Sequence, residues 1–332
     1  MPSAWSVPLE PDPTPWLLEA GEPWVRYRTL TDFVGLAQDD AEVVRARNAI
    51  TKDPRVRRLI EEATAWPGYP LERHNDARHP IHALTILADF GLQVGDPGMG
   101  RVVRELFAHR GAEGAFETLL RVPEAFGGSG RATWAWMLCD APLILYCLAA
   151  FGLADHPHVL KAADHLASLV QENGWPCAAS AEMGRFHGPG RRGDPCPMAN
   201  LLALKALSWF PGHRESPAVK AGAEMLLRHW DHTSERRFFL FGAGSGFRKL
   251  KYPFVWFDLL HVADVITRLP ATRQDARAGS LVQAILGRRD ALSRFTPESV
   301  WLAYREWEFG SKRQPSPWLT FLALRVLRRL QD

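Results

Sequence analysis

The sequence predicts an all-α fold, an α/α toroid (α/α barrel) of six helical hairpin repeats with inner and outer helix rings. Two observations favour it. An apolar helix that begins at a proline recurs six times, and charged amphipathic helices follow most of these apolar helices. Alternating apolar and polar residues, the pattern of β-strands, are nearly absent. We therefore expect almost no sheet.

The six apolar helices are expected to form the inner ring. Proline suits the first turn of a helix, where its missing N–H group has no partner in any case. Each segment is apolar on nearly every side, which is typical of a helix that packs on both faces. The prolines recur at intervals of 55 to 64 residues: Pro23, Pro80, Pro142, Pro197, Pro253 and Pro317.

Three later segments are predicted to be outer helices. In His158–Gln171, Pro217–Trp230 and Thr272–Leu286, apolar residues recur every three or four positions with charged residues between them. The connections from outer to inner helices are long, as in Asn173–Cys196 and Asp290–Ser316. All such loops must gather where the inner helices begin, so we expect a functional mouth there. The aromatic stretch Trp301–Trp318 is a candidate lid.

Composition narrows the class of protein. With 332 residues and 46% apolar content, residues 22–332 are expected to form one domain after a proline-rich extension at 1–21. A net charge of +3 without a basic block argues against nucleic-acid binding. No apolar run approaches the roughly 20 residues of a transmembrane helix. The first residues lack the pattern of a signal peptide, and four cysteines make no disulfide framework. We expect a cytoplasmic protein.

The repeats from Trp24 to Leu330 resemble the terpenoid cyclase and protein prenyltransferase superfamily, and most closely its small, single-domain bacterial members of unassigned function. This resemblance implies a hydrophobic cavity and isoprenoid chemistry. The Asp-x-Asp-Asp acid motif of squalene cyclases does not occur, and Asp39-Asp40 does not complete the metal motif of class I terpene synthases. Asp194-Pro195-Cys196 resembles half of the prenyltransferase zinc motif, but Lys251-Tyr252-Pro253 lacks the matching histidine.

Four candidate catalytic residues stand at or beside the starts of inner helices: His79, Asp140, Cys196 and Tyr252. An imidazole titrates near neutral pH, and a thiol at a helix N-terminus can have a lowered pKa. The alternative for Asp140, as for Ser316, is that it only caps its helix. Cys196 could equally be an ordinary buried thiol.

Five residues are predicted to bind substrate, either as polar groups inside apolar helices or as aromatic walls of the cavity. Arg26 has an alternative, because it could pair with Asp258 and be structural. The five residues are Arg26, Trp136, Asn200, Trp256 and Trp318.

No cofactor is predicted. If zinc is bound, the resemblance assigns Asp194 and Cys196 as ligands, and a third would come from His79 or His187. Other arrangements stay open: a histidine cluster at His74, His79 and His82, or a site made by Cys177, His187 and Cys196. Arg185, Arg191 and Arg192 could bind an anion or form a solvated rim.

The function expected from these features is an enzyme on a hydrophobic small molecule, with isoprenoids as a candidate class. Its chemistry would be acid/base or carbocation chemistry of the lyase, isomerase or cyclase kind. The alternatives are a ligand-binding or scaffold protein that keeps the fold without catalysis, and a zinc-dependent enzyme similar to prenyltransferases. The expected partner is a hydrophobic small molecule, with neither nucleic acid nor a membrane span.

Overall fold

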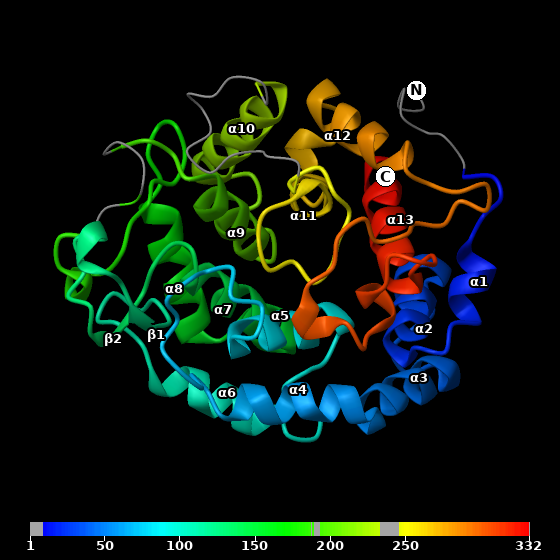
Figure 1. Ribbon diagram of the computed structural model, residues 1–332, viewed down its shortest axis with the longest axis horizontal. Coiled ribbons are helices and arrows are strands. Elements are labelled where there is room, and N and C mark those ends of the chain that lie inside the picture. Colours follow the sequence, from blue (N-terminus) through cyan, green and yellow to red (C-terminus); the bar gives the residue numbers. More distant parts are fainter. Residues whose placement is uncertain (1–8, 187, 189–192, 233–245, 332) are drawn as a thin grey trace. The chain divides into compact units, whose positions relative to one another are not determined.

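The computed structural model describes residues 9–186, 188, 193–232 and 246–331. Within them the chain is mostly helical, with thirteen α-helices and a two-stranded sheet (Figure 1). The chain divides into two compact units. Unit 1 comprises the described residues of Met1–Arg57, Ala243–Phe254 and Asp258–Asp332, and unit 2 those of Arg58–Gly242 and Val255–Phe257. The closed ring of six hairpins, and a domain that begins at residue 22, stay predictions.

Unit 2 contains the predicted contrast between apolar and amphipathic helices. All eleven residues of α5 (Pro80–Phe90) and of α9 (Pro197–Leu207) are buried, as predicted for inner helices. In α8 (Pro157–Ser168), the buried residues Val159, Ala162, Ala163 and Leu166 form one stripe, and most of the other residues are polar or charged. The remaining helices of this unit are α6 (Met99–Ala108), α7 (Ala141–Leu148) and α10 (Pro217–Asp231), and α4 (Pro54–Thr64) carries residues of both units.

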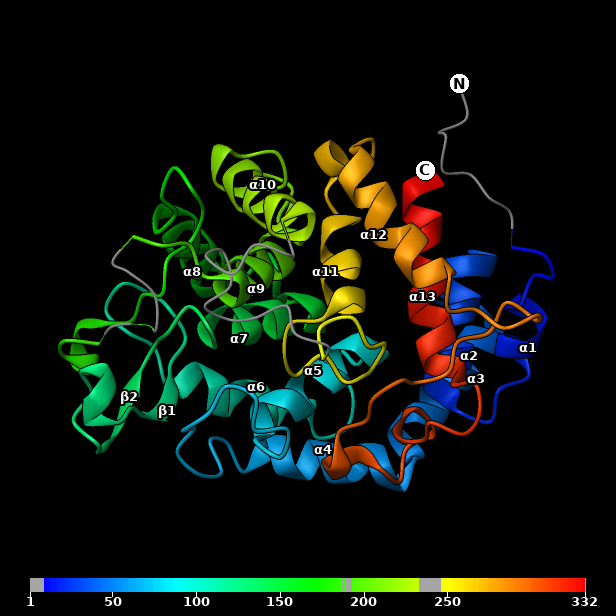
Figure 2. The same ribbon diagram turned by 45° about the horizontal axis from the view of Figure 1, so that its top comes forward.

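In unit 1, α13 (Pro317–Gln331) packs against α11 (Leu259–Ile266) and α12 (Ala276–Leu286). Figures 1 and 2 show these three helices side by side. Ten residues of α13 are buried, among them Trp318, Phe321 and Arg325. The other helices of the unit are α1 (Thr14–Leu18), α2 (Pro23–Thr29) and α3 (Ala41–Lys52).

Five of the six prolines stand where predicted. They occupy the first or second position of α2, α5, α7 and α9, and α13 begins at Pro317. The prediction for Pro253 is wrong, because that helix, α11, begins six residues later at Leu259. Asp258 sets the start, since its carboxylate accepts a hydrogen bond from the His261 N–H at 3.0 Å. The segment before it is not helical, and Phe254, Val255 and Phe257 in it are buried.

The expectation of almost no sheet holds apart from one hairpin between α6 and α7. Strands β1 (Thr118–Arg121) and β2 (Ala132–Ala135) pair antiparallel. Their inner side chains join a small hydrophobic core, and this core fixes the segment that leads to α7. Its buried members are Leu71, Leu120, Val122, Ala135, Met137 and Met183.

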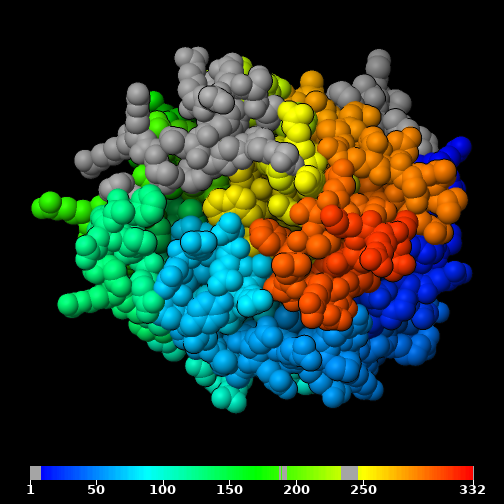
Figure 3. Space-filling model, in the orientation of Figure 1, coloured from blue at the N-terminus to red at the C-terminus, as the bar shows by residue number. Residues whose placement is uncertain are grey.

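The segment 290–316 lies at the surface of unit 1 (orange in Figure 3). Aromatic side chains attach this segment to the rest of unit 1. For example, the Trp301 Nε1–H donates to the Pro253 carbonyl oxygen at 3.0 Å. Trp307 and Phe309 are buried. These contacts tie the predicted lid to its own unit. Among the described residues, no helix combines the length and the apolar character needed to cross a bilayer.

Candidate functional site

Three cysteine thiols from three loops gather in unit 2. Cys139 lies just before α7, Cys177 follows α8, and Cys196 is the N-cap residue of α9. The three thiols hydrogen-bond with one another and none forms a disulfide. Cys139 and Cys196 are buried, whereas Cys177 is partly accessible.

Backbone hydrogen bonds between the loops hold the thiols in place. The Leu138 N–H donates to the Ala178 carbonyl at 3.0 Å, and the Ser180 N–H donates to the Trp136 carbonyl at 2.9 Å. The Cys196 N–H donates to the Trp175 carbonyl at 2.8 Å. Each bond lies beside a cysteine. The loops are therefore built together as one rigid support for the cluster.

Asn200, a predicted substrate-binding residue, is part of this support. It is fully buried, and its amide accepts from the Trp175 N–H at 3.0 Å. The same amide donates to the carbonyls of Trp175 and Cys196, both at 2.8 Å. These three bonds join the first turn of α9 to the loop that carries Cys177.

Replacing Asn200 by Ala is expected to lower the free energy of unfolding by about 3 kcal/mol, because buried backbone groups lose their partners. Urea denaturation measures the change. Asn173→Ala is the matched control, since Asn173 is exposed and makes one bond, to the Gly193 carbonyl. Equal losses in the two variants would contradict the role of Asn200.

The surroundings favour the thiolate form of Cys196. Hydrogen bonds from the Cys139 and Cys177 thiols hold its pKa well below the usual range, and N–H groups at the start of α9 add to this. The Ala199 N–H reaches Cys196 Sγ at 3.5 Å. The pKa of Cys139 is raised by its hydrogen bonds to Cys177 and Cys196. Of the three thiols, Cys196 is therefore the one whose surroundings favour deprotonation.

A histidine–aspartate pair lies beside the thiols. His74 Nδ1 is 2.9 Å from Asp140 Oδ1. Burial lowers the pKa of His74, but the charge of Asp140, its hydrogen bond and the charge of Cys196 outweigh burial and raise that pKa. The second oxygen of Asp140, Oδ2, is buried and has no hydrogen-bond partner among the described residues. The side chain of His74 is 27% exposed, which gives this buried pair a route to solvent.

The cap hypothesis for Asp140 fails on geometry. Asp140 is the N-cap residue of α7, but its side chain accepts no hydrogen bond from the helix. Its carboxylate faces His74 instead. The Asp140 carboxylate therefore orients the His74 imidazole and does not cap α7.

His79 occupies a different kind of position. It caps α5, with Nδ1 accepting from the Ile81 N–H at 3.3 Å and Nε2 donating to the Tyr69 carbonyl at 3.0 Å. Burial lowers the pKa of His79. Burial also lowers the pKa of His82, to about 3. Both rings are therefore neutral at pH 7, and both nitrogens of His79 serve the fold.

Trp136 lies at an apolar depression near the thiols. The depression spans about 280 Å³ including open solvent, and its lining contains Trp136, Leu138, Ala141, Pro142, Leu145 and His165. Leu138 and Ala141 flank Cys139 and Asp140 in the chain. An apolar surface and the titratable cluster thus share one short segment.

Three predicted site residues belong to unit 1, and two of them lie among aromatic rings. Tyr252 is buried among aromatic rings, with centroid distances of 4.9 Å to Phe309 and 5.8 Å to Trp318. Trp318 is fully buried and stacks on Phe321 at 5.0 Å. These contacts make an aromatic cluster around the start of α13.

The pairing proposed for Arg26 and Asp258 is wrong. The guanidinium of Arg26 pairs with Glu42 at 3.6 Å, and both side chains are 48% exposed, because this face of α2 meets α3 rather than the core. Asp258 caps α11. Trp256 is partly exposed, and its ring lies 6.5 Å from that of Phe257.

The described residues contain no group of three or more His, Cys, Asp or Glu side chains arranged to hold a metal ion. The predicted zinc set of Asp194, Cys196 and His79 is therefore not assembled, because His79 uses both nitrogens in the cap of α5. His187, Arg191 and Arg192 lie outside the described residues.

The sequence predicted catalytic roles for Asp140 and Cys196, but not for three further residues of the cluster: His74, Cys139 and Cys177. A signal was present. Three of the four cysteines stand in long loops or at their ends, and His74 stands in a segment rich in histidine and aspartate. Their convergence depends on how three loops pair, which helix periodicity does not determine.

Comparison with known proteins assigns this chain to no family. No family model matches the chain, and no curated protein matches it. A solved structure described as "Crystal structure of a protein from Actinoplanes" is similar over 93% of this chain and 90% of that one. The two share 17% sequence identity, with a TM-score of 0.44.

Proposed function

We propose that the protein is an enzyme of the lyase or isomerase kind that moves protons on an apolar small molecule. The observation that carries this proposal is the 2.9 Å contact between His74 and Asp140 in unit 2, beside the Cys196 thiol, whose pKa is lowered. A base and an acid of opposite charge are thereby held in one cluster. Such pairs of groups, whose environments shift their pKa values in opposite directions, are a mark of catalytic sites.

Each group has a distinct role. The Cys196 thiolate removes a proton from the substrate, and the His74 imidazolium donates a proton to another atom of it. In an isomerisation that atom is a second carbon, and in an elimination it belongs to the leaving group. Asp140 keeps the imidazole oriented and charged through its 2.9 Å contact with Nδ1.

The substrate class is argued from the surroundings. The depression next to this segment is apolar and contains Trp136. The resemblance of the repeats to terpenoid cyclases and prenyltransferases makes an isoprenoid the first ligand to test. The alternative is a scaffold protein without catalysis. The aromatic rings packed around Trp318 favour this alternative for unit 1.

Titration of the thiolate tests the proposal without a known substrate. The ultraviolet absorbance of the thiolate, followed against pH, is expected to show one step well below the ordinary thiol pKa of about 8.5. That step should vanish in Cys196→Ser. Cys147→Ser is the matched control, because Cys147 is a buried thiol of α7 whose pKa is raised by burial. Its removal should leave the step unchanged.

Two results would count against proton transfer by Cys196. One is the absence of any thiolate below pH 8 in the native protein. The other is stoichiometric zinc in the purified protein, found by elemental analysis, with the low-pH step lost when the zinc is chelated. The latter would favour the zinc-dependent alternative instead. If the step is present, melting-temperature shifts with isoprenoid alcohols and diphosphates are the next measurement.

A further inference from the structure

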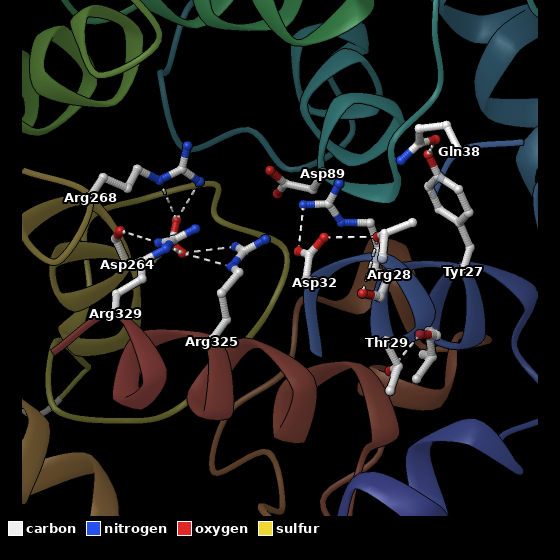
Figure 4. A network of polar contacts seen from close by, with 12 residues as sticks. Tyr27, Arg28, Thr29, Asp32, Gln38, Asp89, Asp264, Arg268, Arg325 and Arg329 are labelled. Carbon is white, nitrogen blue, oxygen red and sulfur yellow. Dashed lines mark hydrogen bonds and ion pairs between the residues drawn. The ribbon is translucent and has the colours of Figure 1, made fainter. Parts of the chain in front are cut away.

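Unit 1 contains a cluster in which three arginines meet one carboxylate (Figure 4). Asp264 of α11 is fully buried. Its Oδ1 accepts from Arg325 Nη2 at 2.8 Å and from Arg329 Nη1 at 3.0 Å. Its Oδ2 accepts from Arg268 Nη2 at 2.7 Å. The cluster ties the end of α11 to the last turns of α13.

The electrostatics at Arg329 are unfavourable. Its pKa is lowered to about 9, chiefly by burial, and the charges of Arg325 and Arg268 lower it further. Asp264 acts in the opposite direction. Arg329 also donates to the backbone carbonyl of Asp264 at 2.9 Å, near the negative end of α11. The lowered pKa indicates that carboxylate and carbonyl together do not offset the cost of placing this cation among the others.

The cluster is open on one side. The side chain of Arg325 is 6% exposed, that of Arg268 is 11% exposed and that of Arg329 is 21% exposed. Arg329 thus has the most accessible of the three side chains, while Arg325 and Asp264 are buried. A planar guanidinium held rigidly from behind has the geometry that binds two oxygens of a phosphate.

We propose that Arg329, at the most accessible edge of the cluster, binds a phosphate group, with Asp264 and Arg325 as its buried support. Phosphate fits this edge because it is a dianion with several acceptor oxygens, and because its charge relieves the repulsion among the guanidiniums. The site lies in unit 1 and does not depend on the function proposed for Cys196. The phosphate can belong to a soluble molecule or to a lipid headgroup.

The probe is inorganic phosphate. A ligand that binds only the folded state raises the melting temperature as its concentration rises. Phosphate is therefore expected to raise the melting temperature of the wild type above the value in chloride at the same ionic strength. The increment should disappear in Arg329→Gln. Calorimetric titration should show that this variant binds phosphate at least about tenfold more weakly than the wild type does.

Arg328→Gln is the matched control. Arg328 is the neighbouring arginine of α13, but it is exposed and donates to the Phe33 carbonyl at 2.7 Å, outside the cluster. Phosphate also stabilises proteins in general by exclusion from their surfaces, and this effect should be the same in both variants. Only Arg329→Gln should lose the specific increment. If Arg329→Gln does not fold, Arg268→Gln and Arg329→Lys repeat the comparison.

Two arms distinguish the source of the phosphate. Inorganic phosphate and pyrophosphate test a soluble ligand, and flotation with vesicles that contain phosphatidic acid tests a headgroup. Binding in either arm that is lost in Arg329→Gln but kept in Arg328→Gln supports the site. An equal increment in phosphate and chloride without vesicle binding, or equal responses of the two variants, would overturn it.

Discussion

Replacing Asp264 by Ala is expected to destabilise the folded protein by about 3–5 kcal/mol, the usual loss when one partner of a buried ion pair is removed. The carboxylate accepts hydrogen bonds from three guanidiniums and is itself fully buried. Without it, Arg325 keeps a buried charge that loses the bidentate contact from its Nε and Nη2 groups. Urea denaturation at neutral pH measures the loss.

Asp32→Ala is the control for this effect. Asp32 pairs with Arg28 at 2.8 Å in the same unit, and Figure 4 draws both pairs. Its side chain is 21% exposed, so water replaces the lost partner. We expect a loss of about 1 kcal/mol or less. Comparable losses in the two variants would mean that the arginine cluster contributes no more than an ordinary partly exposed pair.

The sequence predicted the helices better than the points at which they begin. Proline at the first turn, together with an all-apolar segment, located α2, α5, α7, α9 and α13 because both signals act within a few residues. At Pro253 the same signal was misleading. Asp258 offers a carboxylate that caps the helix five residues later, and Phe254 and Phe257, which lie between, are buried outside the helix. A side-chain cap therefore outweighed the preference of proline.

The candidate site was predictable only in part. Helix starts drew attention to Asp140 and Cys196, which both belong to the observed cluster. The same rule selected His79, whose ring nitrogens are used by the cap of α5, and Tyr252, whose ring is packed among aromatics of unit 1. The pairing of loops around Asn200 brings Cys139, Cys177 and His74 to the cluster, and such long-range pairing leaves no periodic trace in a sequence.

Asp140→Asn is the variant expected to affect catalysis most. Asparagine keeps the shape of the side chain but removes the charge that raises the pKa of His74. The pKa of His74 should therefore fall, and the fraction of imidazolium at neutral pH should fall with it. Because a positioned general acid contributes about 10²-fold or more, we expect turnover to drop by at least that factor once a substrate is known.

The shift of the His74 pKa can be measured by NMR before any substrate is found. A raised pKa in the folded state contributes stability below the unfolded value of about 6.5, and this contribution is lost as the pH rises through the folded pKa. Asp140→Asn should therefore cost most stability below about pH 6.5 and less in alkaline solution. Asp76→Asn is the matched control, because Asp76 lies in the same segment but accepts from the Tyr69 hydroxyl at 2.8 Å. It should leave the titration of His74 unchanged. An unaltered His74 titration in Asp140→Asn would remove the electrostatic basis of the proposed acid, and with it the enzyme hypothesis for this cluster.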